Sequence, residues 1–221
     1  MKKLLFVAAV GAMTFACSNS PEGEKVDAQE AQEVKEVEAT SETYAVAADE
    51  SMIMWEGSDV AGKMHNGAIY LNSGEIMVED GNIVGGNFTI DMGSIENYDV
   101  EDEEYNAKLV GHLKSPDFFN VDSFPTAKFE ITDVAALEGD TAFTHQISGN
   151  LMMKNQTKNI TFKANVTMEN GSIMAESNNF VIDRAQWNVK FRSPSFFSMD
   201  ELKDKAINDE MGIKIKLMAS K

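Results

Sequence analysis

The sequence is poor in cysteine, in histidine and in basic side chains, and each scarcity excludes a class of function. Its 221 residues include one cysteine, so an internal disulfide cannot form. The 36 acidic and 19 basic side chains give a formal net charge of −17, which repels nucleic-acid phosphates and disfavours electrostatic docking on anionic lipid. Three scattered histidines, without spaced carboxylate or cysteine partners, define no metal site. We therefore expect neither a nucleic-acid partner nor a bound metal ion.

The motifs of common catalytic and nucleotide-binding sites are also missing. The sequence contains no recognisable Ser-His-Asp arrangement, phosphate loop or dinucleotide-binding motif. We therefore predict no catalytic residues, no cofactor and no enzymatic activity.

The N-terminus has the layout of a secretory leader. Lys2 and Lys3 precede the apolar run 4–15, which is far shorter than the ~20 residues of a membrane-spanning helix. Ala16 and Cys17 follow in a pattern similar to a bacterial lipobox. We predict that residues 1–16 are a signal peptide and that Cys17 becomes a lipidated N-terminus. In the alternative, a signal peptidase cuts after Ala16 and leaves a free thiol.

Two regions of different composition follow the leader. Residues 17–43 are rich in Glu, Gln, Ala and Ser, and they are predicted to form a flexible acidic tether that cannot fold alone. From Tyr44 onward the composition changes, which predicts one domain over residues 44–221. A lipidated chain with this organisation is expected in a bacterial cell envelope, periplasmic or associated with the outer membrane.

Strict alternation of apolar and polar residues is the main structural signal in the domain. Ile160, Phe162, Ala164, Val166 and Met168 alternate with polar residues, which is the period of a half-buried strand. The same period recurs in the segments NFTIDM, KFEITDVAAL, HQISGNLMMKN and GIKIKL, with turn signals between them. About eight strands result, which predicts an antiparallel sandwich or barrel. A barrel of this size has room inside for side chains or for one small ligand.

Two segments break the strand pattern. The spacing of Leu109 and His112 on one stripe predicts a helix over residues 104–113. Ser198 and Glu201 form a capping box, which predicts a second short helix.

Several segments resemble the YceI-like family. HLKSPDFFNVDSFPTAKF at 112–129 and ISGNLMMKNQTKNITF at 147–162 are similar to its signature segments, and the resemblance covers residues 52–219. Asn155 and Asn188 stand where the family often has glycine, and asparagine is well suited to replace glycine at positive φ. The resemblance implies an all-β, eight-stranded, antiparallel lipocalin-like barrel with one or two short helices. It also implies that the barrel holds a polyisoprenoid lipid and carries no catalytic residues.

Such a ligand needs a long apolar cavity, adaptable walls and a few polar groups at the mouth. Met77, Met92, Met153 and Met168 are candidates for the adaptable wall, or simply fill a core. We expect the helix 104–113 and the aromatic turn that follows it to lie across one end of the barrel. There they close the cavity or guide the tail, or they seal an ordinary core.

The polar candidates each have two interpretations. A histidine bonds a quinone oxygen or diphosphate, or it is a hydrogen-bonded structural residue. Arg184 or Arg192 holds a phosphate head, or pairs with an acidic neighbour on the surface. The candidates for the cavity and its mouth are Trp55, His65, Phe88, Leu109, His112, Phe118, Phe119, Phe129, Phe162, Ala164 and Trp187.

The sequence therefore predicts an envelope-anchored protein that carries or stores a polyisoprenoid, either a quinone or an isoprenoid precursor. Two alternatives remain open. One is a structural or stress-related envelope protein with a solid core, and the other is an enzyme that acts on such a lipid. The expected partners are the isoprenoid lipid and the membrane, with a homodimer as an open possibility.

Overall fold

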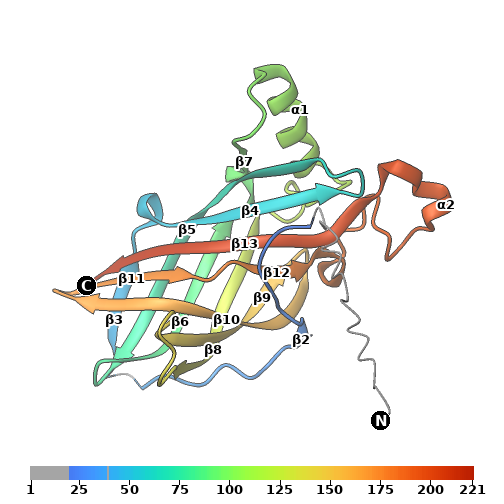
Figure 1. Cartoon of the computed structure of the whole chain (residues 1–221). Helices are drawn as coiled ribbons and strands as arrows, with labels where there is room; N and C mark the ends of the chain where they lie inside the picture. The colour runs from blue at the N-terminus through green and yellow to red at the C-terminus, as the bar shows by residue number, and fades with distance from the viewer. Residues whose placement is uncertain (1–19, 39) are drawn as a thin grey trace, which may run out of the picture.

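The computed structural model describes residues 20–38 and 40–221 (Figure 1). The predicted signal peptide and the lipidation site Cys17 lie outside the described residues.

Eight long strands form a ring in which every pairing is antiparallel. Each strand pairs with the next along the ring, and the last pairs back with the first through Ile213 and Trp55 (Figure 1). This closure confirms the predicted eight-stranded antiparallel barrel. The strands are β4 (Met52–Asp59), β5 (Met64–Glu79), β6 (Asn82–Asp91), β8 (Thr126–Ala136), β9 (His145–Met153), β10 (Gln156–Glu169), β11 (Ser172–Ser177) and β13 (Ile207–Ser220).

The interior of the ring is built from the alternating apolar residues. In β10, Ile160, Phe162, Ala164 and Val166 are buried, as their period predicts. Successive side chains of a strand point to opposite faces, so the polar residues between them face outward.

Shorter elements complete the fold. The short strands are β3 (Glu42–Val46), β7 (Glu96–Asn97) and β12 (Phe180–Asp183), and the 3₁₀ turns are Ala48–Glu50, Met92–Ser94, Arg184–Trp187 and Lys203–Lys205. Helix α1 (Glu103–Lys114) matches the predicted helix to within one residue at each end. Helix α2 (Met199–Leu202) begins at Ser198 with the predicted capping box.

Asparagine residues hold two tight turns. Asn155 has φ of 57° in the β9–β10 turn, and Asn188 has φ of 58° after the 3₁₀ turn Arg184–Trp187. Both residues occupy the left-handed region, as expected where the family often has glycine.

Residues 20–38 run along the outside of the ring, and we call them the N-terminal strap. Strand β1 (Glu24–Lys25) pairs in parallel with β12, and β2 (Gln29–Glu30) pairs with β10 (Figure 1). Further along, Gln32 and Asn150 exchange two hydrogen bonds of 3.0 and 2.7 Å.

The strap therefore differs from the flexible tether that the sequence predicts for this region. Its position has a physical reason. Strand β10 pairs with β11 only from Ala164 onward, while β12 continues along β13. The early part of β10 and the outer edge of β12 thus have unpaired backbone groups, which β2 and β1 satisfy.

Candidate functional site

An apolar cavity of about 140 Å³ occupies the interior of the ring. Its walls come from all eight ring strands, and nearly every lining residue is hydrophobic; Ser177 is the exception. An apolar cavity of roughly 150 Å³ stays dry and accepts a small hydrocarbon.

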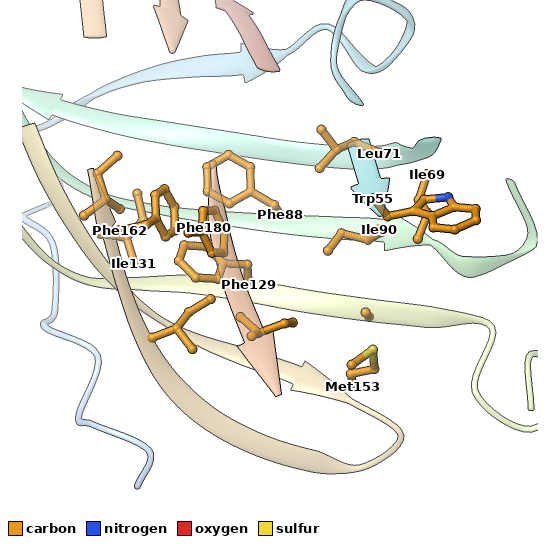
Figure 2. Close-up of a cluster of buried hydrophobic side chains, with 14 of the residues drawn as sticks. Trp55, Ile69, Leu71, Phe88, Ile90, Phe129, Ile131, Met153, Phe162 and Phe180 are labelled. Carbon is orange, nitrogen blue, oxygen red and sulfur yellow. The ribbon is translucent and has the colours of Figure 1, made fainter. Parts of the chain in front are cut away.

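A column of four phenylalanines crosses the interior (Figure 2). The ring centroids of Phe88 and Phe129 are 6.2 Å apart, and those of Phe129 and Phe162 are 5.8 Å apart. Phe162 and Phe180 stack at 4.8 Å with their planes nearly parallel. All four phenylalanines line the inner cavity, and Trp55 lies at one end of the ring (Figure 2).

A second cavity of about 370 Å³ opens at that end, and we call it the mouth. The mouth and the inner cavity share the lining residues Trp55, Ile69, Phe119 and Met211. The two spaces therefore adjoin, apolar within and more polar at the opening.

Helix α1 and the turn after it cover part of the mouth. Phe118 and Phe119 are buried, and the N–H of Phe119 donates to Leu113 O at 3.1 Å. Lys154 Nζ donates to Phe118 O at 2.6 Å and so ties this turn to the β9–β10 hairpin. Burial, together with the charge of Lys190, lowers the pKa of Lys154. The aromatic turn thus packs into the end of the ring, where Phe119 borders both cavities.

His65 lies in the mouth and is oriented by a carboxylate. Its Nδ1 is 2.7 Å from Asp99 Oδ2, while Asp99 Oδ1 accepts hydrogen bonds from Asn66 N and Asn97 Nδ2. Burial alone would raise the pKa of Asp99, but the hydrogen bonds from Asn66, His65 and Asn97 together hold it below its ordinary value. The pair leaves Nε2 of the imidazole available to a ligand.

His112, on α1, contributes an aromatic surface to the mouth. Its ring meets Phe191 edge-on at 4.5 Å and Phe118 at 5.7 Å between centroids. Its Nε2 lies 3.9 Å from Asp117 Oδ2, which is too long for a hydrogen bond.

Arg184 pairs with an acidic neighbour, as one of its two proposed roles states, but it does so in the interior and not on the surface. Its side chain is only 1% exposed, and Nη2 lies 3.2 Å from Asp209 Oδ1. Burial lowers the pKa of Arg184, and Asp209 and Asp183 oppose that effect. The guanidinium is a structural hub that donates to four backbone carbonyls, those of Val189, Phe191, Ile207 and Asn208. Arg192 also lines the mouth, with its guanidinium carbon 5.0 Å from the centre of the Phe191 ring.

The structure brings ten of the eleven candidates together around the two cavities. Trp187 is separate: it is fully buried, lines neither cavity, and donates from Nε1 to Leu151 O at 2.9 Å. The residues that line the inner cavity are Phe88, Phe129, Phe162 and Ala164; those of the mouth are His65, Leu109, His112 and Phe118; Trp55 and Phe119 border both.

Among the candidate methionines, Met92 and Met153 line the inner cavity, and Met77 and Met168 line neither space. Sequence reasoning missed Met211, which borders both cavities. It lies in phase with Ile213, so the alternation of β13 extended by one step would have found it.

Within residues 20–38 and 40–221, no group of three or more His, Cys, Asp or Glu side chains is placed to hold a metal ion.

No helix in the described part of the chain is long and apolar enough to cross a membrane.

A closed ring with an apolar interior and a polar mouth defines the class as lipocalin-like β-proteins. The chain belongs to the YceI-like family, because the model of the YceI-like domain matches residues 44–219.

Solved structures share the fold at low sequence identity. Burkholderia cenocepacia BcnA is 19% identical with a TM-score of 0.59, and the match covers 79% of this chain and 99% of that one. A structure described as a polyisoprenoid binding domain from Saccharophagus degradans is 13% identical with a TM-score of 0.55, covering 80% and 97%.

Curated relatives match a shorter stretch. A UPF0312 protein of Pseudomonas aeruginosa is 41% identical over 76 residues, which are 34% of this chain and 34% of the relative. A UPF0312 protein of Pseudomonas paraeruginosa matches to the same extent. The match thus spans about a third of the length of these curated relatives.

Proposed function

We propose that this protein binds a polyisoprenoid lipid, with the tail in the inner cavity and the head group in the mouth, and that it carries or stores that lipid. The observation that carries the proposal is the continuity of an almost wholly apolar cavity with a more polar opening. The Saccharophagus degradans domain of the same fold, described as polyisoprenoid binding, supports this choice of ligand.

The energetics favour such a ligand. Each buried CH₂ group contributes about 0.8 kcal/mol, so an isoprenoid tail strongly prefers a dry apolar space to water. At the mouth, His65 offers Nε2 to a carbonyl or hydroxyl oxygen of the head, since Asp99 already holds Nδ1.

The tail must displace side chains if it is long. The free space of the inner cavity is near the size of one small hydrocarbon, and the phenylalanine column fills the rest. We propose that Met92, Met153 and Met211 adapt around the tail, since methionine packs flexibly around irregular shapes.

The phenylalanine column also favours a second candidate function. A ring filled by stacked aromatics is suited to an envelope protein with a solid core, which binds no lipid. Catalysis has less support: among the described residues, the hydrogen bonds of His65 include none to a serine, threonine or cysteine side chain.

We further propose that the chain works in the bacterial envelope, with residues 1–16 removed and Cys17 acylated. The support is the charged and apolar leader that ends at Ala16-Cys17. The intact mass of the envelope form tests this part, and a mass equal to the unmodified chain from Cys17 would reject acylation.

Organic extraction of the protein purified from its own envelope, followed by mass spectrometry, tests lipid binding. We expect one polyisoprenoid per chain at most, present in the extract and absent from a mock purification. An extract without isoprenoid, together with failure of the lipid-free protein to take up added polyprenyl lipid, would favour the solid-core function.

A further inference from the structure

A group of apolar side chains is exposed beside the mouth. Phe196, Phe197 and Met199 are 42, 45 and 50% exposed, although they are large and follow one another closely in the chain. Val60, in the β4–β5 turn, and Met64, the first residue of β5, are exposed as well. We call these five residues the mouth rim.

The rim is held in a fixed conformation. The N–H groups of Phe196 and Phe197 both donate to the carbonyl of Ser193, a residue that is fully buried. Directly after the two phenylalanines, Ser198 and Glu201 form the capping box that begins α2. The aromatic side chains therefore project from an ordered turn.

The two segments that carry the rim residues are joined near the mouth. The N–H of Val60 donates to Ala206 O at 3.0 Å and joins the β4–β5 turn to the segment that carries α2. Residues next to the rim, Lys63, Arg192 and Lys205, line the mouth itself. In Figure 1, α2 projects from this end of the ring, on the right of the view.

The local charge differs from that of the whole chain. Residues 190–205 carry four basic and three acidic side chains, in a protein with 19 basic and 36 acidic ones. Lys190 Nζ lies 4.7 Å from the centre of the Phe196 ring, so a cation accompanies the exposed aromatic. The acidic excess that disfavours docking on anionic lipid is thus absent at the rim.

The start of the strap lies on the same half of the ring. Pro21 lies against Gly212, and Lys25 pairs with Glu210, both near the beginning of β13, whose first residue Ile207 lines the mouth. Cys17 is four residues before Pro21, a distance of at most about 14 Å of extended chain. If Cys17 carries the acyl anchor proposed above, the anchor enters the membrane near the mouth.

We propose that the mouth rim docks on a lipid bilayer, with Phe196, Phe197 and Met199 inserted among the head groups. The opening of the cavity then faces the membrane, and an isoprenoid moves between bilayer and ring without crossing water. This inference rests on the proposed function for its purpose, but the docking itself is measured without any bound isoprenoid.

The experiment uses the acyl-free chain from residue 17 with Cys17→Ser, which contains no cysteine. An environment-sensitive fluorophore is attached through Phe197→Cys in one protein and Met174→Cys in another. Met174 is a matched control because it is 50% exposed on β11 and pairs with Met218, far from the start of β13. Vesicles of phosphatidylcholine and phosphatidylglycerol are then added.

We expect the label at position 197 to brighten with vesicles and the label at 174 to remain unchanged. The unlabelled double variant Phe196→Ser/Phe197→Ser should bind vesicles about tenfold more weakly than its parent, because apolar area carries interfacial binding. It should keep the circular dichroism of the parent and still accept a polyprenyl lipid from detergent.

Equal responses at the two labels, or unchanged vesicle binding by the double variant, would overturn the docking proposal. So would a parent that is a dimer in sedimentation, dissociates on the double substitution and ignores vesicles, since the rim would then contact a second copy. Failure of lipid uptake by the parent would instead count against the proposed function alone.

Discussion

At the scale of single residues, Gly149 determines whether Phe129 fits in the ring. A Cβ at position 149 would lie 2.2 Å from the Phe129 ring, and three ring atoms lie within 2.7 Å of it. We predict that Gly149→Ala lowers the free energy of unfolding by about 1–3 kcal/mol, because the buried ring has to shift. Urea denaturation of lipid-free protein measures the change.

Gly111 provides the matched control for this substitution. It lies within α1, and a Cβ there would meet no atom within 4 Å. Gly111→Ala should therefore raise stability by about 0.5–1 kcal/mol. Equal effects of the two substitutions would mean that contact with Phe129 does not limit position 149.

Single residues also mark where sequence reasoning ends. The alternation of β10 correctly placed Phe162 and Ala164 inward, because a strand repeats every two residues. Arg184 could not be assigned in this way. Its role depends on four carbonyls, from Val189 to Asn208, which converge only in the folded chain. Trp187, three residues later in the chain, lines neither cavity, and the sequence pattern did not reveal this either.

At the scale of elements, the strap is hydrogen-bonded to β12 along the outside of the ring. Its N–H groups at Glu24 and Val26 donate to Asn179 O and Val181 O at 3.0 and 2.9 Å. We predict that a chain beginning at residue 40 is less stable than one beginning at residue 17 by about 2 kcal/mol or more, since several backbone groups lose partners. Thermal unfolding of both lipid-free chains measures this.

One exposed ion pair of the strap serves as the control. Lys35 and Asp133 lie 2.5 Å apart with both side chains largely exposed. Lys35→Ala should change stability by less than about 0.5 kcal/mol. If truncation costs no more than this substitution, the strap is a spacer after all. The composition of this segment predicted a spacer. Its pairing with the ring was not visible in the sequence, because β1 and β2 are two residues long and too short for a periodic signal.

The β5–β7 corner should respond to acid through Asp99. The pKa of Asp99 is lower in the folded chain than its ordinary value, so its contribution to stability is complete above the unfolded pKa of about 4. That contribution is lost as the pH falls through the folded pKa. We predict that Asp99→Asn costs about 1 kcal/mol or more at pH 7 and that the difference shrinks below about pH 4. A difference constant from pH 7 to pH 3 would contradict this.

At the scale of the whole molecule, the decisive property is whether the space inside the ring belongs to a ligand or to the core. Ala164 is 1% exposed and lines the inner cavity, so a larger side chain there occupies free volume. We predict that lipid-free Ala164→Phe melts within about 3 °C of the wild type, less than a loss of ~1–2 kcal/mol would cause. We also predict that it no longer takes up a polyprenyl lipid.

Ala68 is the control for this prediction. It is fully buried on β5 but lines neither cavity, so Ala68→Phe overpacks the protein and should cost about 1–3 kcal/mol or more. Both variants must be compared without lipid, because bound ligand stabilises the fold by mass action. A large loss of stability in Ala164→Phe, with no lipid uptake by the wild type, would favour the solid core.

The architecture was predictable at this scale, and the interior was not. The number of alternating segments and the resemblance to the YceI-like family gave the eight antiparallel strands. The size of the cavity depends on how Phe129, Phe162 and Phe180 stack across the ring, which involves three strands far apart in the sequence. Periodicity gives the face of a side chain but not its distance from the opposite wall.

The pairing of β13 with β4 has a consequence for biosynthesis. The ring closes only when the final segment, Ile207–Ser220, reaches Met52–Asp59, so closure joins residues near the two ends of the domain. Contacts of such long sequence separation slow folding. A chain that stops short of Ile207 leaves the edges of β4 and β11 without their partner, open to pairing with other chains. A nascent chain that emerges from N- to C-terminus therefore remains prone to aggregation until its last strand is available.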